Sequence, residues 1–389
     1  GGSAMYKTHV NMKRILCVLY IGSVTAFAPG ASPGLRSSNT PQTRLCSTRR
    51  TASLTGAKMG LFDGIFGGGN AAPPVGDIAQ VAGGWVSPEF MRGFTFDTAS
   101  PAALPAVGFA TLGGVKAGQV PGNGGPAKEN QDGVLNIAEL VDGVQMYCVF
   151  DGHGENGGSV TQWAIENLPG YVGQAVQSGR AGELLNRVTD AYRQADSALE
   201  TALTYKIVED SGSTVATALV KGDLLLVAGL GDSRVVLGVV NDDGSLAAQA
   251  VTRDQSPVVP AEKSRIDRSG GEVREEGPGG RVYAKGKSYP GLAVARALGD
   301  GDAKNYGVTV DPQFIGWKVR PGQDFALILA SDGVWNALGN ENVVEIVGGY
   351  RASRDPTAAA QAVVQVARQA WEENAKGRID DITCLVLLL

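Results

Sequence analysis

The sequence predicts an α+β fold in which two antiparallel β-sheets pack as a sandwich and pairs of helices flank them, in α-β-β-α layers. Three observations predict it. Short runs rich in apolar and β-branched residues recur between Gly/Asp turns after about residue 107, as in hairpin-linked strands. Amphipathic segments at helical spacing occur in pairs between groups of these runs, so helices should cover the sheets. The chain has 389 residues with 43% apolar side chains, enough for a sizeable core.

The first 58 residues are predicted to be a targeting presequence, a signal peptide followed by a transit-like segment. Residues 5–28 combine a basic start, an apolar run at 15–24 and a small-residue end, the pattern of a cleaved signal peptide. This run is too short to span a bilayer comfortably, so we expect no transmembrane span. Residues 29–58 are rich in Ser, Thr and Arg and contain no Asp or Glu, as in organelle transit peptides. Residues 1–4, ahead of Met5, could be an expression scar or an extension.

The two parts of this presequence resemble the bipartite leader of algae with complex plastids. AFAP at 26–29 matches the phenylalanine-bearing motif at the signal-peptide junction of such leaders. The resemblance implies a location in the plastid, in the stroma or on the thylakoid surface. Simple secretion is the alternative.

Residues 59–106 are predicted to be a Gly/Pro-rich linker, because they lack the periodicity of a packed element. The apolar stretch GLFDGIF at 60–66 could make a peripheral membrane contact. Docking of this stretch on the protein's own body is the interpretation we favour.

Residues 107–389 form the predicted folded domain. Seven runs are predicted as strands: 107–112, 146–150, 213–220, 224–229, 235–240, 325–330 and 382–389. Five amphipathic segments are predicted as helices: 159–177, 181–203, 261–269, 340–348 and 356–375.

Charge and composition exclude several classes of protein. The formal net charge is −5, but without the eight basic residues of 1–58 the rest holds 26 basic against 39 acidic residues, a net charge of −13. Nucleic-acid binding depends on Lys and Arg that neutralise phosphates, so we expect no nucleic-acid partner. Two histidines and four cysteines without CxxC spacing argue against a zinc site or a disulfide framework. Cys148 and Cys384 are interpreted as buried core thiols.

Three apolar runs end in, or follow, an aspartate. Asp151 and Asp332 each close such a run and precede a glycine, and Asp381 comes directly before the last run of the chain. Alone, each is more typical of an ordinary turn or cap. Together they suggest a shared cation site, because hard divalent metals prefer carboxylate and carbonyl oxygens. Asp132 offers a fourth carboxylate.

Eight segments resemble, in the same order, the metal-dependent serine/threonine protein phosphatases of type 2C, and the resemblance covers about residues 107–389. They are KENQD at 128–132, VFDGHG at 149–154, GSTVATALV at 212–220, GDSR at 231–234, RDQSPVVPAEKSRIDRSGGEV at 253–273, PGLAVARALGD at 290–300, LASDGVWNAL at 329–338 and DDIT at 380–383. The resemblance implies the sandwich predicted above, and hydrolysis of phosphoserine and phosphothreonine in phosphoprotein partners.

The resemblance also implies metal ligands. Asp151 would bridge two Mg²⁺ or Mn²⁺ ions, and the carbonyl of Gly152 would bind one of them. Asp332 and Asp381 would complete the other ion. Two cations at such a site lower the pKa of a bridging water, whose hydroxide attacks phosphorus.

Further roles follow from the same resemblance. Asp132 would orient metal-bound water, and Asp232 together with Asp332 could hold a third, weaker ion. His153 could protonate the departing serine or threonine oxygen. A purely structural histidine beside the metal is the alternative.

Two positions depart from the family's pattern. The arginine with which family members bind the substrate phosphate corresponds to Ala127, which leaves the adjacent Lys128 as a candidate. Gln131 stands where many members have Glu. Because glutamine keeps the hydrogen-bonding shape without the charge, its contact to the second ion should weaken only modestly.

Three functions remain open at this point. The first is an active phosphatase, which we expect to be a monomer. The second is a catalytically inactive module of the same fold that binds or regulates partners in a plastid. The third is a structural component of a larger plastid assembly. Retention of Asp151, Asp332 and Asp381 favours the active enzyme. Cysteine-based phosphatase chemistry is excluded, because the sixth residue after Cys148 is Gly154 and not an arginine.

Overall fold

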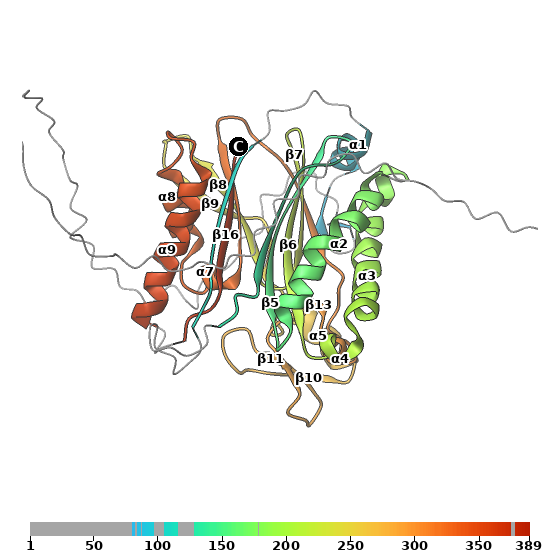
Figure 1. The fold of residues 1–389 in the computed structure, drawn as a ribbon. Coiled ribbons are helices and arrows are strands. Elements are labelled where there is room, and N and C mark those ends of the chain that lie inside the picture. The colour runs from blue at the N-terminus through green and yellow to red at the C-terminus, as the bar shows by residue number, and fades with distance from the viewer. Residues whose placement is uncertain are drawn as a thin grey trace, which may run out of the picture. The chain divides into compact units, whose positions relative to one another are not determined.

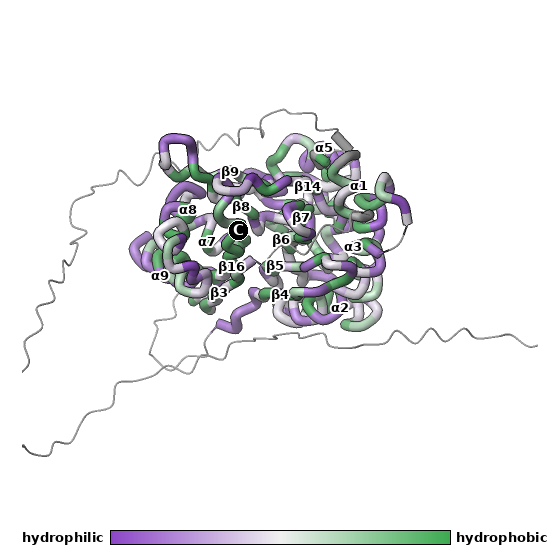
Figure 2. The backbone as a smooth tube through the Cα atoms, turned by 90° about the horizontal axis from the view of Figure 1, so that it is seen from above, coloured by the Kyte–Doolittle hydropathy of each residue, from purple (hydrophilic) through white to green (hydrophobic). Residues whose placement is uncertain are grey.

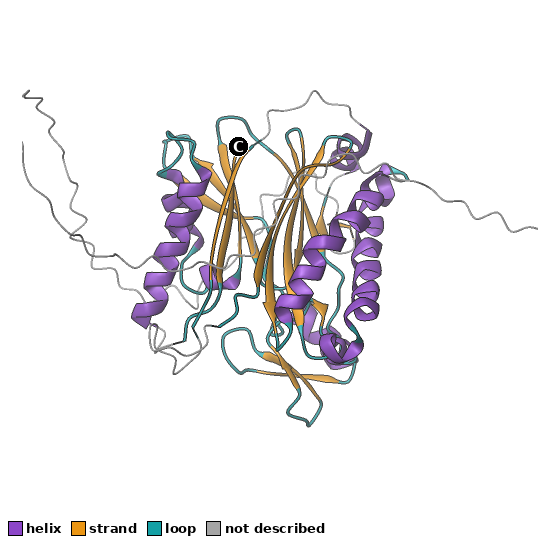
Figure 3. Cartoon of the chain, viewed as in Figure 1, coloured by secondary structure: helices purple, strands orange, loops and turns teal. Residues whose placement is uncertain are grey.

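The computed structural model describes residues 80–81, 84–86, 88–96, 105–115, 128–177, 179–374 and 378–389. Two β-sheets stand face to face between two pairs of helices (Figure 1 and Figure 3). The predicted α+β sandwich in α-β-β-α layers is therefore confirmed. The presequence 1–58 and the stretch 60–66 lie outside the described residues.

The larger sheet has the strand order β1-β2-β14-β7-β6-β5-β4, with β13 paired to β6. Its strands are β1 (Gln80–Val81), β2 (Gly84–Trp85), β4 (Asp132–Val141), β5 (Val144–His153), β6 (Gly212–Lys221), β7 (Leu224–Leu230), β13 (Leu298–Gly299) and β14 (Gln313–Lys318). Neighbouring strands are antiparallel except β2 and β14, which are parallel.

The smaller sheet has the order β3-β16-β15-β8-β9 and is antiparallel throughout. Its strands are β3 (Ala106–Leu112), β8 (Arg234–Val240), β9 (Leu246–Ala250), β15 (Asp324–Ala330) and β16 (Ile382–Leu388). A three-stranded sheet of β10 (Gly271–Arg274), β11 (Arg281–Ala284) and β12 (Pro290–Leu292) lies beyond one end of the larger sheet (Figure 1).

Helices form the two outer layers. α2 (Gly157–Gln177) and α3 (Leu184–Leu203), the latter preceded by the 3₁₀ turn η1 (Ala181–Glu183), cover the larger sheet, whereas α8 (Asn340–Gly348) and α9 (Pro356–Asn374) cover the smaller one (Figure 2). The shorter helices are α1 (Pro88–Phe96), α4 (Tyr205–Val208), α5 (Pro260–Arg268), α6 (Gly301–Lys304) and α7 (Asp332–Trp335).

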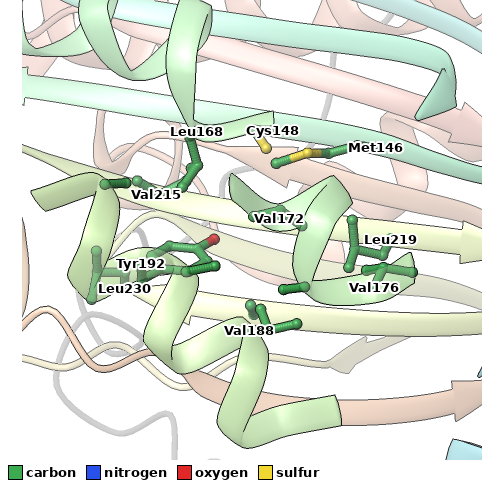
Figure 4. Packing of buried hydrophobic residues seen from close by; sticks show 14 of the residues in the cluster. Met146, Cys148, Leu168, Val172, Val176, Val188, Tyr192, Val215, Leu219 and Leu230 are labelled. Atoms are coloured by element: carbon green, nitrogen blue, oxygen red, sulfur yellow. The ribbon is translucent and has the colours of Figure 1, made fainter. Parts of the chain in front are cut away.

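Alternation along the strands builds a core on each face of the sheets. In β5, Met146 and Cys148 face α2 and α3, whereas Tyr147 and Val149 pack between the sheets, as expected when successive side chains point to opposite faces. Figure 4 shows the helix-side core, in which Tyr192 of α3 lies among side chains from α2 and the sheet. Because both faces of β5 are buried, its central residues 146–150 form one continuous run of apolar and aromatic side chains.

The five predicted helices are confirmed, with bounds that differ by a few residues at most. Pro169 lies inside α2, where it is buried. The predicted segment 181–203 divides into η1 and α3.

The structure differs from the interpretation of 59–106 as a linker without packed elements. Strand β2 adds to the edge of the larger sheet, and α1 buries Met91 and Phe94 in the same core as α2 and α3. The expectation was therefore wrong for residues 84–96. Helix α1 has only 9 residues and contains Gly93, so its amphipathic pattern was too short to recognise.

Both core cysteines are confirmed as free, buried thiols. Burial raises the pKa of the Cys148 thiol to about 12, which keeps it protonated and unreactive. Across the part of the chain that the structure describes, no helix has the length and apolar character needed to cross a membrane.

Candidate metal centre

Four of the predicted carboxylates stand at one end of the sandwich. In the larger sheet, Asp132 begins β4 and pairs with Asp151 of β5. In the smaller sheet, the end of β15 pairs with the start of β16, which places Asp332 and Asp381 beside each other. The Cβ of any other residue at Gly333 would lie 1.9 Å from the Asp381 carbonyl oxygen, so glycine is required for this close approach.

Hydrogen bonds join the two sheets at this end. Ser331 Oγ, which follows β15, donates to Asp132 Oδ2 at 2.8 Å. The backbone N–H of Gln131 donates to Asp381 Oδ2 at 3.0 Å. The carboxylates therefore belong to one site, although they are up to 249 positions apart in the chain, from Asp132 to Asp381.

Asp381 is almost completely surrounded by donors. The Gly114 N–H donates to Oδ1 at 2.7 Å, and the Lys128 ammonium lies 2.9 Å from Oδ2. The same ammonium lies 3.0 Å from Oδ1 of Asp380. Lys128, proposed from the sequence as a phosphate ligand, is therefore directed at two carboxylates. Burial lowers its pKa, but these two acids outweigh burial and raise the pKa above its usual value.

Asp132 is not fully satisfied. Its Oδ1 atom is buried and has no hydrogen-bond partner, which is costly in a protein interior. Burial, with the Asp381 charge adding to it, raises the pKa of Asp132 to about 8. A buried carboxylate with a free oxygen is suited to accept a proton or to bind a cation.

The neighbouring carboxylates show the same electrostatic pattern. Burial and then the Asp380 charge raise the pKa of Asp332 to about 6. Burial and the charge of other acids hold the pKa values of Asp151 and Asp232 well above their ordinary value. The negative charge of Asp151, Asp232 and Asp332 is therefore poorly compensated by the protein.

The donor set fits a hard divalent cation. Among the described residues, no three Asp, Glu, His or Cys side chains are grouped so that they could hold a metal ion by themselves. Mg²⁺, however, keeps several waters and takes only one or two carboxylates in many protein sites. The free oxygen of Asp132 and the uncompensated charge of Asp151 and Asp332 meet that smaller requirement.

The remaining predicted residues lie around these carboxylates. Gly152 follows Asp151, and its N–H donates to the Gln131 carbonyl at 3.2 Å. The side chain of Gln131 donates to the Gly154 carbonyl at 3.1 Å, so it braces the loop after β5. Asp232 lies in the turn between β7 and β8 and interacts electrostatically with Asp332.

His153 ends β5 and has a carboxylate partner that sequence reasoning missed. Its Nε2 lies 2.7 Å from Asp300 Oδ2. Burial lowers the pKa of His153, but the Asp300 carboxylate outweighs it and holds that pKa above its usual value. A Cβ at Gly212 would lie 2.1 Å from the same oxygen, so this glycine makes room for the pair. The ALGD end of the segment 290–300 carried the only sequence signal for Asp300.

Comparison with known proteins gives consistent matches. The family model described as "Protein phosphatase 2C" matches residues 123–375. "Probable protein phosphatase 2C 72" of Arabidopsis thaliana is 34% identical over 258 residues, which are 62% of this chain and 75% of that protein. "Probable protein phosphatase 2C 12" of Oryza sativa subsp. japonica is 42% identical over 183 residues, 46% of each chain. The crystal structure of a serine-threonine phosphatase 2C from Toxoplasma gondii matches with a TM-score of 0.61 and 26% identity, over 74% of this chain and 96% of that one.

Proposed function

Because this chain belongs to the protein phosphatase 2C family, and is thus a metal-dependent phosphoprotein phosphatase, we propose that it hydrolyses phosphoserine and phosphothreonine with Mg²⁺ or Mn²⁺ held by its strand-end carboxylates. Asp151, the Gly152 carbonyl, Asp332 and Asp381 would hold two ions. Asp232, with Asp332, would hold a third and weaker one. The observation that carries the proposal is the buried carboxylate cluster with its free Asp132 oxygen.

The bound cations would offset the negative charge of the cluster and supply Lewis-acid activation of water for attack on phosphorus. Asp132 is held by Ser331 through one oxygen only, and its other oxygen would accept a proton from the attacking water. The free oxygen is the geometric basis of this role, because it is buried and has no hydrogen-bond partner. Gln131 would keep the loop after β5 in place.

His153 would donate a proton to the departing serine or threonine oxygen. Asp300 supports this role, because a carboxylate partner orients the imidazole and stabilises its charged form. The raised pKa of His153 increases the protonated fraction at neutral pH. Lys128 would reach a substrate phosphate only in a state in which its ammonium has left Asp380 and Asp381.

Hydrolysis of p-nitrophenyl phosphate by the full chain tests the proposal. We expect Mn²⁺-dependent turnover in the wild type, and a loss of at least about a hundredfold in Asp151→Asn and in Asp332→Asn. Asp267→Asn, which changes an exposed carboxylate on α5, is the control and should retain full activity. Equal rates in all four proteins would contradict the assignment.

Turnover of a phosphopeptide distinguishes an active enzyme from the alternative, an inactive binding module. Such a module would bind phosphoproteins without Mn²⁺-dependent turnover of any phosphopeptide. The carboxylate cluster favours the enzyme, since its desolvation cost has no evident purpose in a protein that needs only to bind.

For the location, we propose the stroma or thylakoid surface of a plastid, on the basis of the two-part leader at 1–58. The natural substrates would then be plastid phosphoproteins. A fluorescent fusion of the full chain should coincide with chlorophyll fluorescence, whereas accumulation in the medium would support secretion. We further propose that the enzyme is a monomer, which size-exclusion chromatography with light scattering would test.

A further inference from the structure

Lys128 forms ion pairs with two neighbouring acids of the candidate metal centre, Asp380 and Asp381. Its ammonium lies 3.0 Å from Asp380 Oδ1 and 2.9 Å from Asp381 Oδ2. The side chain of Lys128 is 19% exposed and that of Asp381 is 3% exposed. Because solvent screens a half-buried pair only weakly, this contact is stronger than an ordinary surface ion pair.

The contact leaves Asp381 with no free oxygen. Oδ1 accepts from the Gly114 N–H, and Oδ2 accepts from the Gln131 N–H and from Lys128. The two backbone donors are fixed by the fold. Lys128 is the one donor of the three that can move away, because its ammonium is carried on a flexible four-carbon stem.

Several acidic side chains surround Asp381, and Lys128 offsets part of their charge. Asp132, Asp332 and Asp380 all lie within electrostatic reach of one another or of Asp381. Another cation of the same loop, Arg378, is 4.0 Å from Asp380 and 69% exposed. Lys128 is therefore the closer of these two positive charges on this side of the cluster.

We propose that Lys128 is a built-in counter-ion that holds the metal centre together when no cation is bound and competes with the divalent cation for Asp381. The inference rests on the assignment of Asp381 as a metal ligand in the proposed function. In this role Lys128 pairs with carboxylates, in place of the substrate phosphate suggested by the sequence.

Competition fixes the sign of the expected effects. A cation that binds Asp381 through Oδ2 must displace the ammonium, and one that binds through Oδ1 must tolerate a like charge nearby. Removing that charge should therefore strengthen cation binding and lower the stability of the metal-free protein. A lysine that merely positioned Asp381 for the metal would give the opposite result, because its loss would weaken cation binding.

The experiment uses the full chain and three variants. Lys128→Gln removes the positive charge, and Lys128→Arg retains it. Arg378→Gln removes a positive charge from the loop before β16, where no close contact to Asp381 is lost. Mn²⁺ affinity is measured by titration calorimetry on metal-stripped protein. The melting temperature is measured with EDTA and again with Mn²⁺, so neither readout depends on catalysis.

We expect Lys128→Gln to bind Mn²⁺ about three to ten times more tightly than the wild type, the change produced by loss of one partly buried ion pair. Its melting temperature in EDTA should fall by about 2–4 °C, and its rise on adding Mn²⁺ should be larger. Lys128→Arg and Arg378→Gln should resemble the wild type.

Weaker or unchanged Mn²⁺ binding by Lys128→Gln would overturn the proposal, and so would the absence of measurable binding in every variant. Failure of the proposed function is recognised separately. If Mn²⁺ binds with the expected order of affinities but p-nitrophenyl phosphate is not hydrolysed, the counter-ion role stands and the enzymatic role does not.

Discussion

Asp300 illustrates how one residue can act through another. It is 3% exposed, adopts a left-handed backbone conformation with φ of 55°, and presents Oδ2 to His153 Nε2. A non-glycine residue held in that region is strained, so the surrounding segments must fix it. We interpret Asp300 as a positioning residue that keeps the imidazole protonated and directed.

Asp300→Asn should slow hydrolysis of a phosphoserine peptide by about a hundredfold, because the alkoxide leaving group needs a proton. The rate on p-nitrophenyl phosphate should fall much less, because nitrophenolate leaves without a proton. Steady-state kcat on both substrates measures the effect. Asp302→Asn, which changes the acid bonded to the exposed Tyr205, is the control. Equal losses on the two substrates, or a loss of Mn²⁺ binding, would indicate a merely structural role.

At the residue level, the sequence was informative wherever a carboxylate follows or precedes an apolar run. Asp151, Asp332 and Asp381 could be proposed as neighbours on that basis, and the structure places them at one end of the sandwich. The partners Asp300 and Lys128 could not be predicted in the same way. Their contacts depend on tertiary distances across 147 and 252 positions of the chain, which no local pattern encodes.

At the scale of elements, the runs buried on both faces were recognised, whereas several half-exposed strands were missed. β5 and β15 are buried along nearly their whole length, whereas the edge strand β4 buries only Leu135 and Ile137 fully. β14 was missed for a related reason, since most of its residues are half-buried. Strands of this kind form because a neighbour supplies the hydrogen bonds, which a single segment does not reveal.

Helix α1 contributes to stability through its buried face. Phe94 is completely buried and Met91 is 5% exposed. Phe94→Ala should lower the free energy of unfolding by about 3 kcal/mol, the usual cost of truncating a core aromatic residue. Urea denaturation measures it. Tyr289→Ala, which removes an aromatic ring that is 47% exposed, should change stability by less than about 0.5 kcal/mol. If both variants are equally stable, α1 does not belong to the cooperative core.

Helix α5 is tied to the segment before α6 by a buried carboxylate. Glu262 is 1% exposed and accepts from Arg296 Nε at 3.1 Å, with Arg265 on its other side. Burial raises the pKa of Glu262, but the two arginines outweigh burial and hold it below the usual 4.5. Its ion pairs therefore stabilise the protein above pH 4.5, and that contribution is lost as the pH falls through the lowered value.

Glu262→Gln should accordingly cost about 3 kcal/mol of unfolding free energy at pH 7, because two arginines lose their charge partner. Below the lowered pKa, protonation removes the same charge from the wild type, so the difference between the two proteins should shrink. Urea denaturation at pH 7 and at successively lower pH values measures this. A difference that stays constant down to the acid unfolding of the wild type would show that charge is not the cause.

At the scale of the whole molecule, the metal centre joins the two halves of the sandwich. Asp132 and Asp151 belong to the larger sheet, and Asp332 and Asp381 flank strands of the smaller one. Away from this end, a cluster of buried apolar and aromatic side chains packs between the sheets. In the proposed function, ions held by Asp151, Asp332 and Asp381 would therefore act as a cross-link at one end of that core and relieve the mutual repulsion of the carboxylates.

Binding of Mn²⁺ should raise the melting temperature of the whole domain, and the rise should grow with the logarithm of the Mn²⁺ concentration above the dissociation constant. Because the proposed function takes the metal ligands from both sheets, Asp151→Asn and Asp332→Asn should each abolish most of the rise. In EDTA, however, each substitution should leave the protein as stable as the wild type or more so, because it removes one of several repelling buried charges. Differential scanning calorimetry across a Mn²⁺ series tests both signs. If either variant keeps the full Mn²⁺-dependent rise, the cation is held within one sheet and the cross-link does not exist.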